Sequence, residues 1–189
     1  MKTDKSTDNW TEGQKIYKYG TLVIFPPPNI VKPIDKLRKQ YDPASHAIGG
    51  AHITLTQPFL KQPTDNDFIK IKKIVSRYSS FSIHVGPLNN FLPYPCIYYE
   101  IHPVDKVLGI RHAMHDTGLF NLSLPHTVDF VPHMSITNGY PGLARTKEIF
   151  QELSKETTEW AFNCCEISYM VPNPDFHFEV VSILPLHYY

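Results

Sequence analysis

The sequence predicts an α+β protein with two lobes, and three observations lead to this prediction. Segments with the two-residue alternation of β-strands are interleaved with segments that have the charge and capping signals of helices. The order strand, helix, strand, helix, strand occurs twice along the 189 residues. In each half the central strand carries the same five-residue pattern, "HITLT" at 52–56 and "HMSIT" at 133–137. We therefore expect two lobes that are related by a pseudo-twofold axis around a central cleft.

The first half begins with a β-rich run that ends in three prolines, which cannot continue a strand ladder. A later segment has Thr64 as an expected N-cap, acidic residues in its first turn and basic residues afterwards, as helices do. The elements expected here are a strand at 19–25, a helix at 29–41, a strand at 51–59, a helix at 64–78 and a strand at 81–88.

The second half repeats this order and adds one strand. Its expected elements are a strand at 96–103, a helix at 104–118, a strand at 133–140, a helix at 143–160, a strand at 162–171 and a last strand at 176–186. We expect residues 1–15 to be a flexible lead-in and 16–189 to form a single bilobal domain. The turn residues of "NNFLPYP" place the break between the lobes near 89–95, and the C-terminal strands could pair with either lobe.

Composition limits the classes of partner. Eighteen basic residues balance eighteen acidic ones, so no overall field favours a long nucleic acid, and a small or short anionic ligand fits better. The three cysteines, two of them adjacent, favour neither a disulfide framework nor a structural zinc site. The N-terminal residues lack a secretory h-region, and the longest apolar run, at 22–25, is too short to span a bilayer. We expect a cytoplasmic monomer that uses no membrane contact.

The repeated pattern places polar side chains on one face of each central strand. Residues two apart on a β-strand point the same way, so His52, Thr54 and Thr56 share one face. His133, Ser135 and Thr137 share the corresponding face of the second strand. If these strands lie side by side, two imidazoles and at least two hydroxyls meet in one cleft.

Such a group of side chains suits attack on a phosphodiester. One neutral histidine can take a proton from the attacking oxygen while the other, protonated, gives a proton to the leaving oxygen. The hydroxyls of Thr54 and Ser135 can donate hydrogen bonds to the nonbridging oxygens. This chemistry requires neither a metal nor another cofactor, and we expect His52 and His133 to be the catalytic residues.

Other residues near the two motifs allow more than one interpretation. Phe59 and Tyr140 could stack on a base, together with substrate contacts from Thr56 and Thr137, or all four could be core or loop anchors. His112 and His115, three apart on a helix, leave open a metal-dependent hydrolase that uses the additional histidines. A nucleotide- or RNA-end-binding module with little catalysis is a further alternative.

With these motifs, the opening "TLVIFPP" and the closing "FEVVSILPL", the sequence resembles the 2H phosphoesterase superfamily and, within it, the LigT-like or 2′,5′-RNA ligase group. The resemblance implies a bilobal α+β fold with a central cleft. It also implies metal-independent cleavage or joining at 2′–5′ linkages or 2′,3′-cyclic phosphates, on RNA ends or small nucleotides. DNA is a poor substrate candidate, because it lacks the 2′-oxygen. The motif positions of the family fall on His52, Thr54, His133 and Ser135.

Overall fold

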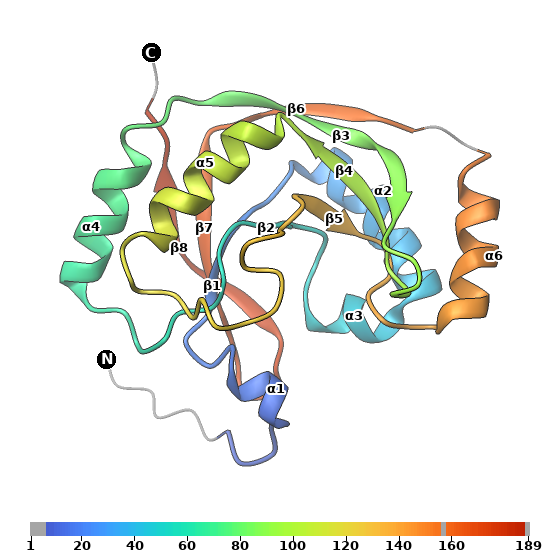
Figure 1. Cartoon of the computed structure of the whole chain (residues 1–189), viewed down its shortest axis with the longest axis horizontal. Coiled ribbons are helices and arrows are strands. Elements are labelled where there is room, and N and C mark those ends of the chain that lie inside the picture. Colours follow the sequence, from blue (N-terminus) through green and yellow to red (C-terminus); the bar gives the residue numbers. More distant parts are fainter. Residues whose placement is uncertain (1–6, 156–157, 188–189) are drawn as a thin grey trace.

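The structure is a computed structural model that describes residues 7–155 and 158–187. Within these residues the strands form two four-stranded antiparallel sheets (Figure 1). The first sheet has the order β2 (Ile53–Thr54), β1 (Thr21–Ile24), β7 (Glu166–Pro172) and β8 (Phe178–Pro185). The second has the order β5 (His133–Ser135), β4 (Ile97–His102), β3 (Phe81–Asn90) and β6 (Trp160–Cys164). The expected bilobal α+β class is confirmed.

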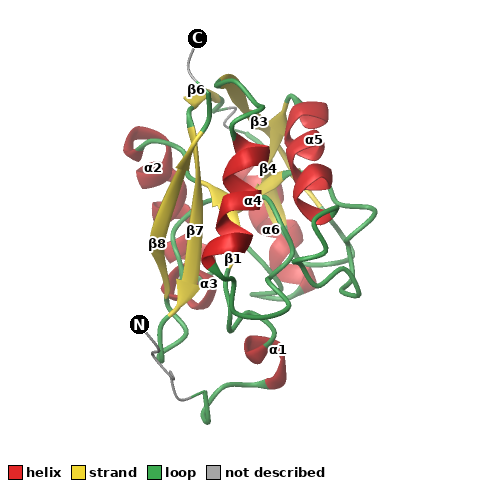
Figure 2. Cartoon of the chain, turned by 90° about the vertical axis from the view of Figure 1, so that its left-hand side faces the viewer, coloured by secondary structure: helices red, strands yellow, loops and turns green. Residues whose placement is uncertain are grey.

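The helices surround the two sheets, with α4 and α6 at opposite ends of the molecule (Figures 1 and 2). Their bounds are α1 Glu12–Lys15, α2 Pro28–Tyr41, α3 Pro43–Ile48, α4 Asp65–Val75, α5 Val104–His115 and α6 Leu143–Leu153. The cap expected at Thr64 is present, because Thr64 Oγ1 accepts from Asp67 N at 3.3 Å and Asp67 Oδ2 accepts from Thr64 N at 2.9 Å. None of these helices combines the length and the apolar character that crossing a membrane requires, as far as the described residues go.

One hydrophobic core joins the two sheets. It contains Leu22 and Ile53 from the first sheet, Ile83 and Met134 from the second, and Ile71 from α4, all fully buried. A shared core fixes the two sheets relative to each other, because moving one of them would expose apolar area on both.

The chain crosses between the sheets at other places than the sequence suggested. Strands β3 and β4 pair antiparallel in one sheet, from His84↔His102 to Asn90↔Ile97, so the expected break near 89–95 is a connection within the second sheet. Strand β3 of the first half belongs to the second sheet, and β7 and β8 of the second half belong to the first. This placement depends on long-range pairing, which turn residues do not specify.

The expected lead-in at 1–15 needs a correction for its described part. Trp10 is buried, lies edge-to-face on Phe176 with ring centroids 5.1 Å apart, and donates from Nε1 to Pro174 O at 2.8 Å. Thr11 then caps the short helix α1. Trp10 therefore anchors this segment to the turn between β7 and β8, although most of residues 7–15 are exposed, and residues 1–6 lie outside the described part of the chain.

Candidate active site

The two motif strands meet at the centre of the molecule. Strands β2 and β5 are edge strands of their sheets and contact each other there (Figure 1). A cleft of about 290 Å³ lies beside them. Its lining comprises Tyr17, Thr21, Arg38, Ser45, Ile48, Gly49, His52, Thr54, His133, Ser135, Asn138, Met170, Phe176 and Phe178. The fold thus brings both histidines and both hydroxyl residues of the H-x-[S/T] motifs to one cavity.

Each histidine is oriented by the same hydrogen bond. His52 Nδ1 lies 2.7 Å from Gly50 O, and His133 Nδ1 lies 2.6 Å from Val131 O. Because a carbonyl oxygen only accepts hydrogen bonds, Nδ1 must carry the proton in both rings. The Nε2 atom of each neutral ring is then left as the proton acceptor.

Both imidazoles are held in the neutral form near pH 7. Burial is the main cause that lowers the pKa of His52 to about 4; Arg38 and His133 contribute to the decrease, and the Gly50 hydrogen bond opposes it. Burial also lowers the pKa of His133, and His126 adds to this decrease. The influence of His133 on His52 is consistent with their position in one cleft.

The cleft lining favours an anionic ligand. Of the described residues that form it, none is Asp or Glu, and Arg38 is the only Lys or Arg. Thr54 is paired with Val23, and Ser135 is paired with Tyr98 and lies with Oγ 3.8 Å from Cys96 Sγ. A phosphate in this cleft would therefore meet hydroxyl donors and no fixed negative charge on the lining.

The last threonine of each motif does not reach the cleft, which corrects its tentative role in substrate binding. Thr56 and Thr137 are 1% and 0% exposed. Thr56 Oγ1 accepts from Leu22 N at 3.1 Å, and Thr137 Oγ1 accepts from Ile97 N at 3.0 Å. These threonines therefore hold each motif strand to its neighbour.

The reason is a β-bulge at the same place in both motifs. Leu55 N and Thr56 N both donate to Leu22 O, at 3.0 and 3.2 Å. In the second copy, Ile136 N and Thr137 N both donate to Ile97 O, at 2.7 and 3.2 Å. Two successive residues opposite a single partner interrupt the alternation on which the sequence argument relied.

The aromatic residues that follow the motifs are also not cleft residues. Phe59 is 2% exposed and packs on Phe120 and Tyr169, with ring centroids 4.5 and 5.4 Å away, so its proposed stacking on a base is wrong. Tyr140 is 53% exposed and is not among the residues that line the cleft.

A different group of aromatic residues, which the sequence did not indicate, forms one wall of the cleft. Tyr17 and Phe178 meet edge-to-face at 6.1 Å, and Phe178 meets Phe176 at 5.4 Å. They come from the residue range after α1 and from the β7–β8 hairpin. The one local indication of these aromatic residues in the sequence is the "FHF" at 176–178, and its alternation predicts the start of the strand at 176–186.

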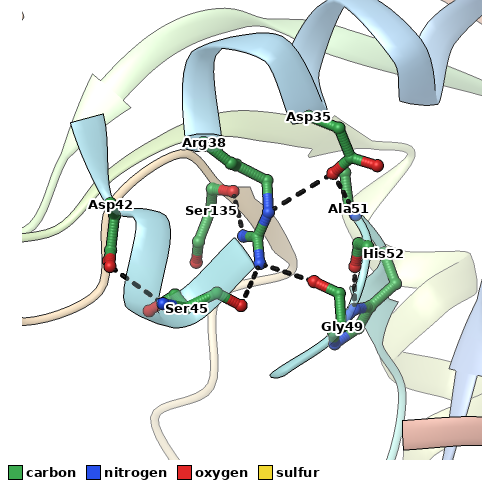
Figure 3. A network of polar contacts seen from close by, with 9 residues as sticks. Asp35, Arg38, Asp42, Ser45, Gly49, Ala51, His52 and Ser135 are labelled. Atoms are coloured by element: carbon green, nitrogen blue, oxygen red, sulfur yellow. Dashed lines mark hydrogen bonds and ion pairs between the residues drawn. The ribbon is translucent and has the colours of Figure 1, made fainter. Parts of the chain in front are cut away.

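Arg38 was likewise not identified from the sequence. It is 6% exposed, and its guanidinium donates to the carbonyls of Ser135 (2.8 Å), Ser45 (3.0 Å) and Gly49 (2.9 Å) (Figure 3). Asp35 lies 3.4 Å from Arg38 Nε and accepts from Ala51 N at 2.8 Å. In the helical pattern of 29–41, Arg38 could not be distinguished from a solvated charge.

The described residues provide no metal-ligand set for the alternative of a metal-dependent hydrolase that uses the additional histidines. Within residues 7–155 and 158–187, no three His, Cys, Asp or Glu side chains are grouped so that they could bind a metal. The Nε2 atom of His115 accepts from Gln57 N at 3.1 Å. His115 Nε2 is therefore already used in a structural hydrogen bond.

The fold and the cleft define the class of protein, an enzyme of the two-histidine phosphoesterase type. Residues 26–175 match the model of the 2′-5′ RNA ligase superfamily. The chain belongs to this superfamily.

Similar proteins agree with this classification. A Bacillus anthracis protein that is described provisionally as a phosphoesterase is 34% identical over 121 residues, which cover 62% of this chain and 68% of that protein. Among solved structures, Escherichia coli LigT complexed with 3′-AMP has a TM-score of 0.59 at 12% identity, covering 90% of this chain and 98% of that one. The Thermus thermophilus protein TT0787 has a TM-score of 0.56 at 11% identity, covering 88% and 96%. At these identities the structural likeness concerns the fold.

Proposed function

We propose that this protein is a metal-independent phosphoesterase that acts on 2′,3′-cyclic phosphates or 2′–5′ linkages of RNA ends or small nucleotides. The observation that carries the proposal is the equivalent placement of His52 and His133 in one cleft, each with Nδ1 bonded to a backbone carbonyl. Proton transfer to and from oxygens on opposite sides of one phosphorus requires two such groups.

In hydrolysis of a 2′,3′-cyclic phosphate, the Nε2 atom of one histidine takes a proton from water as its oxygen bonds to phosphorus. The bond from phosphorus to one ribose oxygen breaks, and the other histidine donates its Nε2 proton to that oxygen. Thr54 and Ser135 donate hydrogen bonds to the nonbridging oxygens. If a hydroxyl of a second nucleotide takes the place of water, the same steps form a new phosphodiester bond while the bond from phosphorus to the 3′-oxygen breaks, which leaves a 2′ linkage.

We assign the base to His52 and the acid to His133. The pKa of His52, at about 4, is the one driven lower, so this ring is neutral throughout the neutral range. His133 must bind a proton to act as the acid, and an anionic phosphate in the cleft would raise its pKa from the lowered value that burial causes.

A nucleotide is the ligand that the rest of the cleft favours. The wall of Tyr17, Phe176 and Phe178 offers apolar ring surface beside the phosphate-binding side chains. Escherichia coli LigT, of the same fold, has been solved in complexes with 3′-AMP, NADP⁺ and ATP. These points support a base on the aromatic wall while the phosphate lies between the histidines.

Turnover of a substrate panel tests the proposal. The panel contains 2′,3′-cyclic mononucleotides, 2′–5′ oligoadenylate and RNA with a cyclic-phosphate end, with 3′–5′ oligoadenylate and DNA as comparisons. We expect activity on the first group that resists EDTA and decreases on the order of 10²–10⁴-fold in His52→Ala. His84→Ala removes a half-exposed histidine that is paired with Glu159 at 3.0 Å and should retain activity.

Two results would contradict the proposal in different ways. Tight nucleotide binding without turnover on any member of the panel would favour the binding-module alternative. Activity that EDTA removes and a divalent ion restores would favour the metal-dependent hydrolase.

A further inference from the structure

Two arginines are buried on helices that lie outside the motif strands. Arg38, on α2, is 6% exposed, and Arg111, on α5, is 1% exposed. Arg38 has Asp35 nearby, whereas no ion pair of Arg111 is found in the described part of the chain. Burying a guanidinium is unfavourable unless its donors are used. Both guanidinium groups use their donors on backbone carbonyls.

Arg38 joins the second motif to the loop before the first. Its Nη1 donates to Ser135 O at 2.8 Å, in the second motif strand. Its Nη2 donates to Gly49 O at 2.9 Å, three residues before His52 (Figure 3). One rigid planar group therefore connects the backbone beside one histidine to the backbone that leads to the other.

Arg111 joins the first motif to the loop before the second. Its Nη1 donates to Leu55 O at 2.9 Å, in the first motif. Its Nη2 lies 3.3 Å from His126 O, and its guanidinium lies 3.9 Å from the ring centroid of Phe130. Phe130 in turn contacts the His133 ring at 5.8 Å. Arg111 thus connects the first motif to the loop that leads to the second.

An acceptor four residues after each arginine completes the arrangement. Asp42 Oδ2 accepts from Asn138 N at 2.8 Å, and His115 Nε2 accepts from Gln57 N at 3.1 Å. Asn138 and Gln57 are the residues directly after the two motifs, with the same separation in sequence as the histidines (138 − 57 = 81 and 133 − 52 = 81). The arrangement therefore follows the pseudo-twofold relation of the lobes.

We propose that Arg38 and Arg111 are a crossed pair of positioning residues that set the separation and orientation of His52 and His133. The proposal rests on the proposed function. Arg111 is not among the residues that line the cleft, so it acts through the backbone of Leu55 and not on the substrate. The two histidines must reach oxygens on one phosphate at the same time, and a displacement of about 1 Å costs on the order of 10² in rate.

The decisive variants are Arg111→Met and Arg111→Lys. We expect kcat to decrease by about 10²-fold in both while KM changes by less than about threefold, because the substrate contacts are retained and the proton transfers are misaligned. Lysine keeps the charge but lacks the planar fork that reaches both Leu55 O and His126 O. Arg145→Met, on the exposed side of α6, is the matched control and should change neither constant.

Loss of stability alone must be distinguished from loss of alignment. Ile149→Ala removes a buried side chain of α6 and should lower the melting temperature while kcat is retained. In a His52→Ala background, Arg111→Lys should cost less than about threefold more, because the proton transfer that it aligns has already been removed. A full 10²-fold loss in that background, or wild-type kcat in a folded Arg111→Lys protein, would overturn the proposal.

A readout without turnover separates this proposal from the proposed function. If the wild type hydrolyses no member of the panel, the proposed function fails, and the imidazole signals of His52 and His133 in NMR spectra still test the positioning. Both signals should shift in Arg111→Lys and stay in place in Arg145→Met. Signals that do not move in a folded Arg111→Lys protein would refute the crossed pair.

Discussion

Protonation of His115 should weaken the fold in acid by an amount that the structure allows us to calculate. The side chain is 6% exposed, and its Nε2 accepts from Gln57 N, which requires a neutral ring. Burial lowers its pKa to about 4, and the charges of Arg111 and His112 contribute. In the unfolded chain the ring returns to about 6.5.

The sign follows from these two values. Below pH 6.5 the unfolded chain binds the proton first, so the free energy of unfolding decreases as the pH falls, until the folded protein also binds it near pH 4. At about 1.4 kcal/mol per pKa unit, the complete loss is about 3 kcal/mol, of which about 2 kcal/mol is reached at pH 5. Above pH 7 the group has no effect on stability.

Urea denaturation at pH 8 and pH 5 measures this loss. In His115→Gln an amide oxygen can accept from Gln57 N at every pH, and His52 titrates as before. The decrease in unfolding free energy between the two pH values should therefore be about 2 kcal/mol smaller in His115→Gln than in the wild type. His177→Gln controls for the loss of an exposed histidine. The same decrease in wild type and His115→Gln would show that the buried ring is not the group that titrates.

The remaining predictions concern the cleft. Replacing His52 or His133 by alanine should lower kcat on the order of 10²–10⁴-fold in steady-state assays, while circular dichroism stays unchanged. Thr54→Ala and Ser135→Ala should cost somewhat less, on the order of 10²–10³-fold, since proton transfer remains. A plot of kcat/KM against pH should be bell-shaped with its centre below pH 6.5, because burial lowers the pKa of both histidines in the free protein. Phe178→Ala should raise KM for nucleotides with kcat retained, and an unchanged KM would remove the base from the aromatic wall.

Local patterns in the sequence predicted most of the elements and four residues that line the cleft. They missed the short helices α1 and α3, and they joined β6 and β7, which lie in different sheets, into one strand at 162–171. The H-x-[S/T] spacing held because His52 and Thr54 flank a single residue of a strand, so the alternation needs to persist over one step only. The helix cap at Thr64 was equally local, since all of its hydrogen bonds lie within four residues. Signals of this kind do not depend on where the rest of the chain goes.

The parts that the sequence did not predict depend on contacts between distant segments. The bulges that bury Thr56 and Thr137 arise from sharing one carbonyl on a neighbouring strand, which no alternation pattern contains. Arg38 and Arg111 were inconspicuous among helical charges, because the motif carbonyls that they bind, Ser135 O and Leu55 O, lie 97 and 56 residues away. The place of β7 and β8 in the first sheet, where β7 pairs with β1 and β8 with β7, also depends on long-range pairing.

In the proposed reaction, the duplicated motif residues of the cleft bind the phosphate, and its unequal aromatic groups bind the nucleoside. Each group that contacts the phosphate in the proposed reaction, a histidine and a hydroxyl, occurs twice. The features that position these groups also occur twice: the carbonyl that accepts from the histidine, the β-bulge and the buried arginine. A phosphate diester has two bridging and two nonbridging oxygens, so a twofold arrangement of groups suits it. The nucleoside has no such symmetry. The aromatic wall of Tyr17, Phe176 and Phe178 lies in the first lobe, whereas His133 in the second is enclosed by the rings of Phe91, Tyr98 and Phe130. We therefore expect these unequal aromatic groups to set the direction in which the nucleoside lies, so that His133, the proposed acid, faces the leaving oxygen.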